Sequence, residues 1–159
     1  MNTKKLVRAA LVAAIYTALS YFANIFGITY GAIQCRFSEA LTILPFVWPE
    51  TTWGLFIGCI LTNILSPMGI PDLIFGSLAT LIAALVTSKC RNRWIAGIPP
   101  VVSNGVIIGA VIAWYEVGFT GAFFGAWLYN CVTVAVGEAI AVFVLGELLL
   151  TGVQKLKKD

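Results

Sequence analysis

The chain has 159 residues, of which 60% are hydrophobic and 11% are charged, and its net charge is +3. Because soluble domains carry roughly 25% charged residues, this composition indicates an integral membrane protein with one domain, residues 1–159. The sequence has no histidine, which excludes serine–histidine catalysis and most zinc sites, so we expect no metal and no cofactor. The basic residues lie in short clusters, which indicates membrane orientation rather than nucleic-acid binding.

The first predicted element begins close to the N-terminus. Lys4, Lys5 and Arg8 precede an apolar run that extends from Leu6 to Phe26. This run is longer than the roughly 7–15 apolar residues of a signal peptide, and no small-x-small cleavage site ends it. We therefore expect a retained first membrane helix.

Five more apolar segments follow along the chain. We expect helices at about Phe37–Trp48, Trp53–Ser66, Asp72–Ser88, Trp94–Tyr115 and Phe119–Leu150. The first two of these are short for a bilayer, which a helix of about 20 residues crosses. Pro45 and Pro49 interrupt them, so they form either two short helices or one broken element.

The positions of the basic clusters decide the number of spans. The clusters are Lys4/Lys5/Arg8, Lys89/Arg91/Arg93 and Lys155/Lys157/Lys158. The positive-inside rule places all three in the cytoplasm, so an even number of spans separates each neighbouring pair. The sequence therefore predicts an all-α integral membrane protein. We expect a six-transmembrane-helix bundle with cytoplasmic N- and C-termini and outer loops at residues 27–36, 67–71 and 116–118.

Polar side chains are rare in these segments, and most fall in the predicted outer half of the bundle. Arg36 and Glu39 open the second helix, and Asn104 and Asn130 each lie about 15 Å along their helices. Ionisable groups inside a bilayer usually face a cavity or a partner, so we predict an outward-facing ligand cavity. Glu138 lies about 27 Å along the last helix, nearer the inside, so we expect it to make a structural hydrogen bond or ion pair rather than to contact a ligand. The predicted substrate-binding residues are Arg36, Glu39, Asn63, Asp72, Asn104, Trp127 and Asn130.

Each of these residues also has a structural interpretation. Arg36 and Glu39 are three residues apart and could pair with each other. Asp72 could cap the N-terminus of its helix. Asn104 and Asn130 could join helices by hydrogen bonds.

Small residues recur at four-residue spacing, which allows two helices to approach closely. On the first helix we expect a partner interface, with internal packing as the alternative, at Ala9, Ala10, Ala13 and Ala14. We expect packing inside the bundle at Gly54/Gly58, Gly105/Gly109 and Gly121/Gly125.

One polar stretch carries a family resemblance. QCRFSEALTILP, Gln34 to Pro45, resembles the signature of the queuosine-precursor transporter (QueT) family. This family is a branch of the substrate-binding (S) components of energy-coupling factor (ECF) transporters, and the resemblance covers essentially the whole chain. WLYNCV, Trp127 to Val132, resembles the sixth-helix segment where vitamin-binding members place an asparagine on the ligand.

The resemblance implies a multi-pass protein of a prokaryotic plasma membrane that captures a 7-deazaguanine, such as 7-aminomethyl-7-deazaguanine, from outside. It also implies a transmembrane coupling protein and two ATPases as partners, with the alanine face of the first helix at the coupling protein. The chain has no GxxxxGK[ST] phosphate loop, so ATP hydrolysis would belong to those partners.

The resemblance also suggests how the polar residues divide the ligand among them. Either Glu39 or Asp72 would accept hydrogen bonds from the ring edge, an asparagine amide would satisfy mixed edges, and Trp127 would stack on the ring. Arg36 would orient Glu39, and the segment from Gln34 to Arg36 would form part of a lid.

Three other functions remain open from the sequence. An S component for a riboflavin- or thiamine-type vitamin would use the same pocket chemistry. A membrane-embedded enzyme is disfavoured because no convincing nucleophile–base pair is present. A purely structural subunit would not need polar residues that converge in one half of the bundle.

Overall fold

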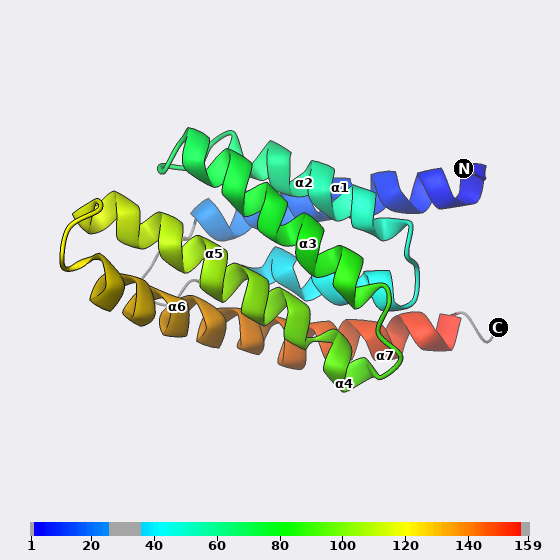
Figure 1. The fold of residues 1–159 in the computed structure, drawn as a ribbon. Helices are drawn as coiled ribbons and strands as arrows, with labels where there is room; N and C mark the ends of the chain where they lie inside the picture. The colour runs from blue at the N-terminus through cyan, green and yellow to red at the C-terminus, as the bar shows by residue number, and fades with distance from the viewer. Residues whose placement is uncertain (1, 26–35, 157–159) are drawn as a thin grey trace.

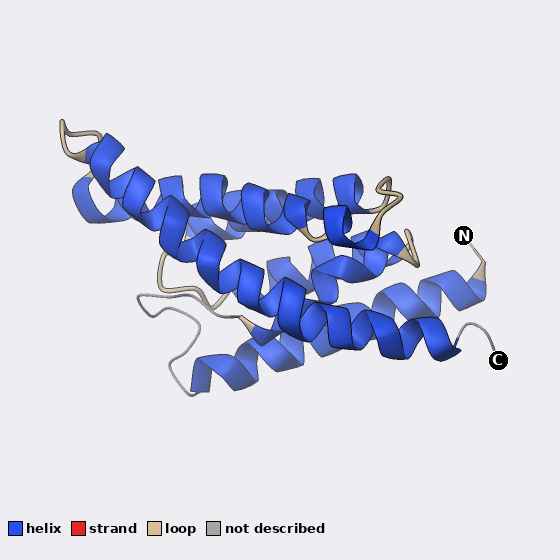
Figure 2. Ribbon diagram, turned by 90° about the horizontal axis from the view of Figure 1, so that it is seen from below, coloured by secondary structure: helices blue, strands red, loops and turns tan. Residues whose placement is uncertain are grey.

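The computed structural model describes residues 2–25 and 36–156, which form a bundle of helices and contain no strand (Figures 1 and 2). The all-α prediction is therefore confirmed for this part of the chain. The elements in chain order are α1 (Thr3–Ile25), η1 (Phe37–Phe46), α2 (Thr51–Asn63), η2 (Asp72–Gly76), α3 (Ser77–Thr87), α4 (Arg93–Ala96), α5 (Ile98–Val117), α6 (Phe123–Ile140), η3 (Ala141–Gly146) and α7 (Glu147–Leu156). The π-helical turns η2 and η3 continue directly into α3 and α7.

The six predicted helical segments are all present, and most ends differ by only a few residues. The largest differences are in the last segment, which begins at Phe123 rather than at Phe119 and ends at Leu156 rather than at Leu150. Gly118 ends α5 with a φ of 60°, a conformation that favours glycine, and its N–H donates to Trp114 O at 2.9 Å. The predicted turn at 116–118 therefore lies a few residues later in the chain.

Three of the six segments are long and apolar enough to cross a membrane, namely Thr3–Ile25, Arg93–Val117 and Phe123–Lys155. The second segment differs from the expected span. η1 is a 3-10 helix of 10 residues, which gives a length of about 20 Å at a rise of about 2.0 Å per residue. A hydrocarbon core of about 30 Å is longer than that, so η1 does not cross a bilayer alone.

Instead, η1 forms the centre of the bundle. It contacts α1, α2, α3, α5, α7 and η3. Leu41 and Leu44 pack into one apolar cluster with Tyr16 and Leu55, and Ile43 packs into a second cluster. Residues 38–45 are all buried. Because its neighbours cover every side of η1, the whole segment is buried rather than one stripe of it.

The outer faces of the bundle are apolar. Along α1, for example, Leu6, Val7, Leu11, Phe22 and Ile25 are all more than half exposed. Soluble proteins rarely expose apolar surface so continuously, whereas lipid tails cover it. The exposed side chains therefore agree with the membrane class that composition indicates.

The residues of the basic clusters that the structure describes lie at one end of the bundle. The start of α1, the end of α7 and the connection between α3 and α4 lie at that end in Figure 1. Two ion pairs hold elements together there: Arg8 Nη1 lies 3.2 Å from Glu50 Oε1, and Arg93 pairs with Glu147. Basic segments that share one end agree with the positive-inside argument, and the number of membrane passes stays a prediction.

Small residues allow α1 and α2 to approach closely, as the spacing predicted. A Cβ atom added at Gly54 would lie 2.2 Å from Ala9 O, and one added at Gly58 would lie 3.0 Å from Ala13 O. Gly105 and Gly109 make similar contacts with α6. The third pair is different, because nothing lies within 4 Å of a Cβ added at Gly121 or Gly125. Internal packing at that pair was a wrong prediction.

Replacing Gly54 with alanine should therefore separate α1 from α2. The new methyl group meets backbone, which cannot rotate away, so we expect a loss of about 2 kcal/mol in the free energy of unfolding. Titration with a denaturing detergent measures this quantity. Gly125→Ala adds the same methyl group in open space and should be within about 0.5 kcal/mol of the parent chain. Equal stability of the two variants would contradict the close packing.

Candidate ligand-binding site

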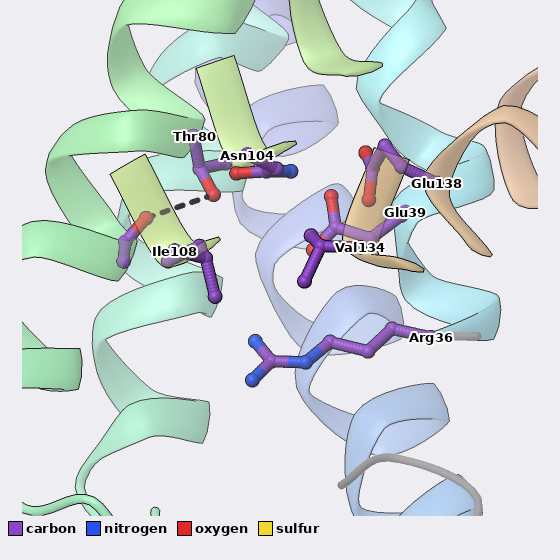
Figure 3. Close-up of a pocket in the computed structure, with 8 residues that line it drawn as sticks. Arg36, Glu39, Thr80, Asn104, Ile108, Val134 and Glu138 are labelled. Carbon is purple, nitrogen blue, oxygen red and sulfur yellow. Dashed lines mark hydrogen bonds between the residues drawn. The ribbon is translucent and has the colours of Figure 1, made fainter. Parts of the chain in front are cut away.

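A buried polar cavity lies between η1, the η2–α3 helix, α5 and α6 (Figure 3). Its eight lining residues are Arg36, Glu39, Gly76, Thr80, Asn104, Ile108, Val134 and Glu138. They follow a simple rule: α5 supplies residues 104 and 108, α6 supplies residues 134 and 138, and the η2–α3 helix supplies residues 76 and 80. Residues four apart share one face of a helix, so each helix presents one face to the cavity.

Two carboxyl groups meet in this cavity. Glu39 is 3% exposed and Glu138 is 4% exposed. Both side chains line the cavity, and their carboxyl groups lie side by side in Figure 3. The Tyr16 hydroxyl on α1 donates a hydrogen bond to Glu39 Oε1. Glu39 Oε2 and Glu138 Oε1 have no hydrogen-bond partner among the described residues, so both can accept from a ligand.

Amide and hydroxyl groups complete the polar surface. The Asn104 amide lines the same cavity as Glu138. The Thr80 hydroxyl donates to Gly76 O, at 3.2 Å, or to Cys59 Sγ, at 3.3 Å. The free space in the cavity is about 20 Å³, which admits roughly one water molecule. A planar heterocycle needs more room than this, so binding one requires the surrounding helices to separate.

Arg36 pairs with Asp72 rather than with the neighbouring Glu39. Its Nη2 lies 3.6 Å from Asp72 Oδ2, and its Nη1 donates to Asn63 Oδ1 at 3.5 Å. Asn63 also donates to Asp72 O at 3.1 Å, and Ser66 Oγ donates to Asp72 Oδ2 at 2.6 Å. Asp72 and Asn63 are fully buried and do not line the cavity. Asp72 and Asn63 therefore support Arg36, and the orientation of Glu39 by Arg36 stays a prediction.

Gly76 explains how this network fits beside the cavity. A Cβ atom at that position would lie 2.7 Å from both Asn63 Nδ2 and Asp72 Oδ1. Only a glycine leaves space for the two polar side chains behind the cavity wall.

Two predicted binding residues on α6 lie elsewhere. Asn130 is buried and donates to Glu116 Oε2 at 2.9 Å and to Ala126 O at 3.0 Å. It shares a face with Val134 and Glu138 but lies about one turn beyond Val134, where the lining of the cavity on α6 ends. Trp127 donates to Val106 O at 3.1 Å. It lines an apolar groove of about 550 Å³ formed mainly by η2, α5 and α6. Neither residue lines the polar cavity in this conformation.

The four alanines of α1 divide between two faces. Ala9 and Ala13 are buried against α2, as the alternative interpretation proposed, so they are not accessible to a partner in this conformation. Ala10 and Ala14 are exposed. Gln34 and almost all of the predicted outer loop at residues 27–36 lie outside the described residues, so the predicted lid stays a prediction.

The sequence analysis missed three polar residues at the cavity or in contact with its lining. Glu138 was assigned to a structural bond on the basis of its depth, and Tyr16 and Thr80 were not considered. The spacing of Val134 and Glu138, four residues apart on the helix that carries Asn130, was the signal available for Glu138. No signal in the sequence indicated that Tyr16 would reach Glu39 from another helix.

Comparison with known proteins shows the family of this chain. Residues 6–155 match the family described as QueT transporter. The chain is 38% identical over 81 residues to the queuosine precursor transporter QueT of Lactococcus lactis subsp. cremoris (strain MG1363). That alignment covers 51% of this chain and 47% of the relative, so it spans about half the length of each. No solved structure matches the chain. Because the family match covers nearly all of the sequence, the chain belongs to the QueT transporter family.

Proposed function

We propose that this protein is the substrate-binding S component of an ECF-type importer of the ATP-binding cassette class. It captures a queuosine precursor, a 7-deazaguanine such as 7-aminomethyl-7-deazaguanine, from outside the cell. The observation that carries the proposal is the buried cavity with two carboxyl groups that have unsatisfied acceptor oxygens. The name of the Lactococcus relative supports the substrate class.

The chemistry of a 7-deazaguanine complements this cavity. The ring has N–H donors beside a carbonyl acceptor, and its aminomethyl substituent adds a cation near neutral pH. Glu39 and Glu138 accept from the cationic aminomethyl group, because ionised carboxyl groups are acceptors only. The Asn104 amide or the Arg36 guanidinium donates to the carbonyl. A ligand that satisfies these groups removes the cost of burying them without partners.

Binding and transport are separate tasks in this proposal. The chain carries no phosphate loop, so two ATPase subunits and a transmembrane coupling protein supply the energy for uptake. The exposed side of α1 that carries Ala10 and Ala14 is the proposed contact with the coupling protein, since small residues permit close helix approach. We propose that all six helical segments belong to the membrane domain in the plasma membrane, with the basic end and both termini in the cytoplasm.

An uptake assay tests the coupled mechanism. Cells that lack their own transporter are given this chain with or without the coupling protein and the two ATPases. Accumulation of labelled 7-aminomethyl-7-deazaguanine is expected only with the complete set, and it should stop when the phosphate-loop lysine of the ATPases is replaced. Equal accumulation with this chain alone would contradict the S-component role while leaving a transport role intact.

A further inference from the structure

The carboxyl groups in and next to the cavity outnumber the single arginine that lies beside them. Arg36 faces three buried carboxyl groups, those of Asp72, Glu39 and Glu138. No lysine and no second arginine is among the described residues that line the cavity. Ionised carboxyl groups without a counterion are very costly in a low-dielectric interior.

The contact between Glu39 and Glu138 itself requires a proton. Two ionised carboxylates that face each other are both acceptors and repel, whereas a single shared proton turns the contact into a hydrogen bond. The two carboxyl groups line one cavity and lie side by side in Figure 3. Each keeps an oxygen that finds no donor in the described part of the chain.

Other groups around the pair do not replace that proton. The titratable or charged groups that face the pair from neighbouring elements are Tyr16 on α1, Cys59 on α2, Asp72 on η2 and Arg36 beside η1. Tyr16 donates to Glu39, but to Oε1. Asn104 and Thr80, from α5 and α3, are polar but do not titrate near neutral pH.

We propose that the Glu39–Glu138 pair holds one proton in the ligand-free protein and exchanges it for the cationic group of the ligand. The inference rests on the proposed function and specifies which part of the ligand the pair recognises, namely the aminomethyl end. On binding, the ammonium group takes the position between the two carboxyl groups, both of them become carboxylates, and the proton leaves to the external water. The charge of the occupied site is thus the same as that of the empty site.

This exchange makes affinity depend on pH and on the charge of the ligand. Release of one proton tightens binding about tenfold for each unit of increasing pH between about pH 6 and pH 7. The amine of the ligand stays protonated over that range, as alkyl amines do. A neutral relative, 7-cyano-7-deazaguanine, leaves the proton in place and should show no such dependence.

Calorimetry of the full-length chain in detergent measures the proton directly. Binding of 7-aminomethyl-7-deazaguanine is recorded at one pH in two buffers, phosphate and Tris, which differ in their heats of ionisation. The heats should differ by the equivalent of about one proton released per ligand. For 7-cyano-7-deazaguanine the heats should be equal. In Glu138→Gln the amide donates to Glu39 in place of the shared proton, so release on binding the cationic ligand should fall to near zero.

The outcomes separate the two proposals. Binding of the cationic ligand with equal heats in both buffers would overturn the proton exchange and leave the transport function standing. Absence of binding by both deazaguanines would overturn the proposed function and the exchange together. Glu50→Gln is the matched control, since Glu50 pairs with Arg8 at the basic end, and it should release the same number of protons as the parent chain.

Discussion

Replacing Glu39 with glutamine is expected to lower the affinity for 7-aminomethyl-7-deazaguanine about hundredfold. The substitution keeps the size of the side chain and an oxygen that can accept from Tyr16, so the fold should persist. It removes a buried negative charge that accepts hydrogen bonds from the ligand, and such charge-assisted bonds contribute about 1.5–3 kcal/mol each. Since about 1.4 kcal/mol corresponds to a tenfold change in affinity, the upper end of this range gives the expected loss. Calorimetric titration of the purified chain measures it.

Glu50→Gln controls for a general effect of removing a carboxylate. Glu50 contacts Arg8 at the basic end of the bundle and not the cavity. Its affinity for the ligand should stay within about twofold of the parent value, because only a distant charge changes. If Glu39→Gln also stays within twofold, Glu39 does not contact the ligand, and the proposed site is wrong.

Asp72→Asn is expected to have its main effect on stability, with a loss of about 3 kcal/mol in the free energy of unfolding. Asp72 is fully buried and lies 3.6 Å from Arg36. Removing one member of a buried ion pair leaves the other charge without that counterion, which costs about 3–5 kcal/mol. Asparagine retains an oxygen that can accept from Ser66, so the lower end of the range applies. Titration with a denaturing detergent measures the change.

A double-mutant cycle assigns this loss to the ion pair. In an Arg36→Gln background the guanidinium is absent, so Asp72→Asn should cost less than about 1 kcal/mol. An undiminished loss in that background would show that Asp72 stabilises the fold through other contacts. Affinity distinguishes the two carboxylates further. Because Asp72 does not line the cavity, Asp72→Asn should weaken ligand binding less than Glu39→Gln does.

Much of the fold is predictable from this sequence because two strong signals agree. Long apolar runs with prolines and glycines between them locate the helical segments, and the basic clusters fix which helix ends lie together. The sequence does not reveal that Phe37–Phe46 is a buried 3-10 helix at the centre of the bundle. An apolar run of that length is compatible with a short span and with a buried element, and only the tertiary packing distinguishes them.

The cavity was predicted less completely than the fold. Arg36, Glu39 and Asn104 line it, as expected. Glu138 was missed because depth was counted from Phe119, whereas α6 begins at Phe123 and continues through η3 into α7. Depth along a helix also says nothing about which face turns inward. Trp127 and Asn130 have suitable depth, yet the rotation and packing of α6 place Trp127 in an apolar groove and Asn130 against Glu116.

The most direct test of the central claim is calorimetric binding of the purified, full-length chain to 7-aminomethyl-7-deazaguanine, with guanine, riboflavin and thiamine as competitors. The account predicts tight binding of the deazaguanine, weaker binding of guanine, which lacks the aminomethyl cation, and no binding of the two vitamins. Heat of binding from riboflavin or thiamine, with none from the deazaguanine, would contradict this account and would indicate an S component for a vitamin instead.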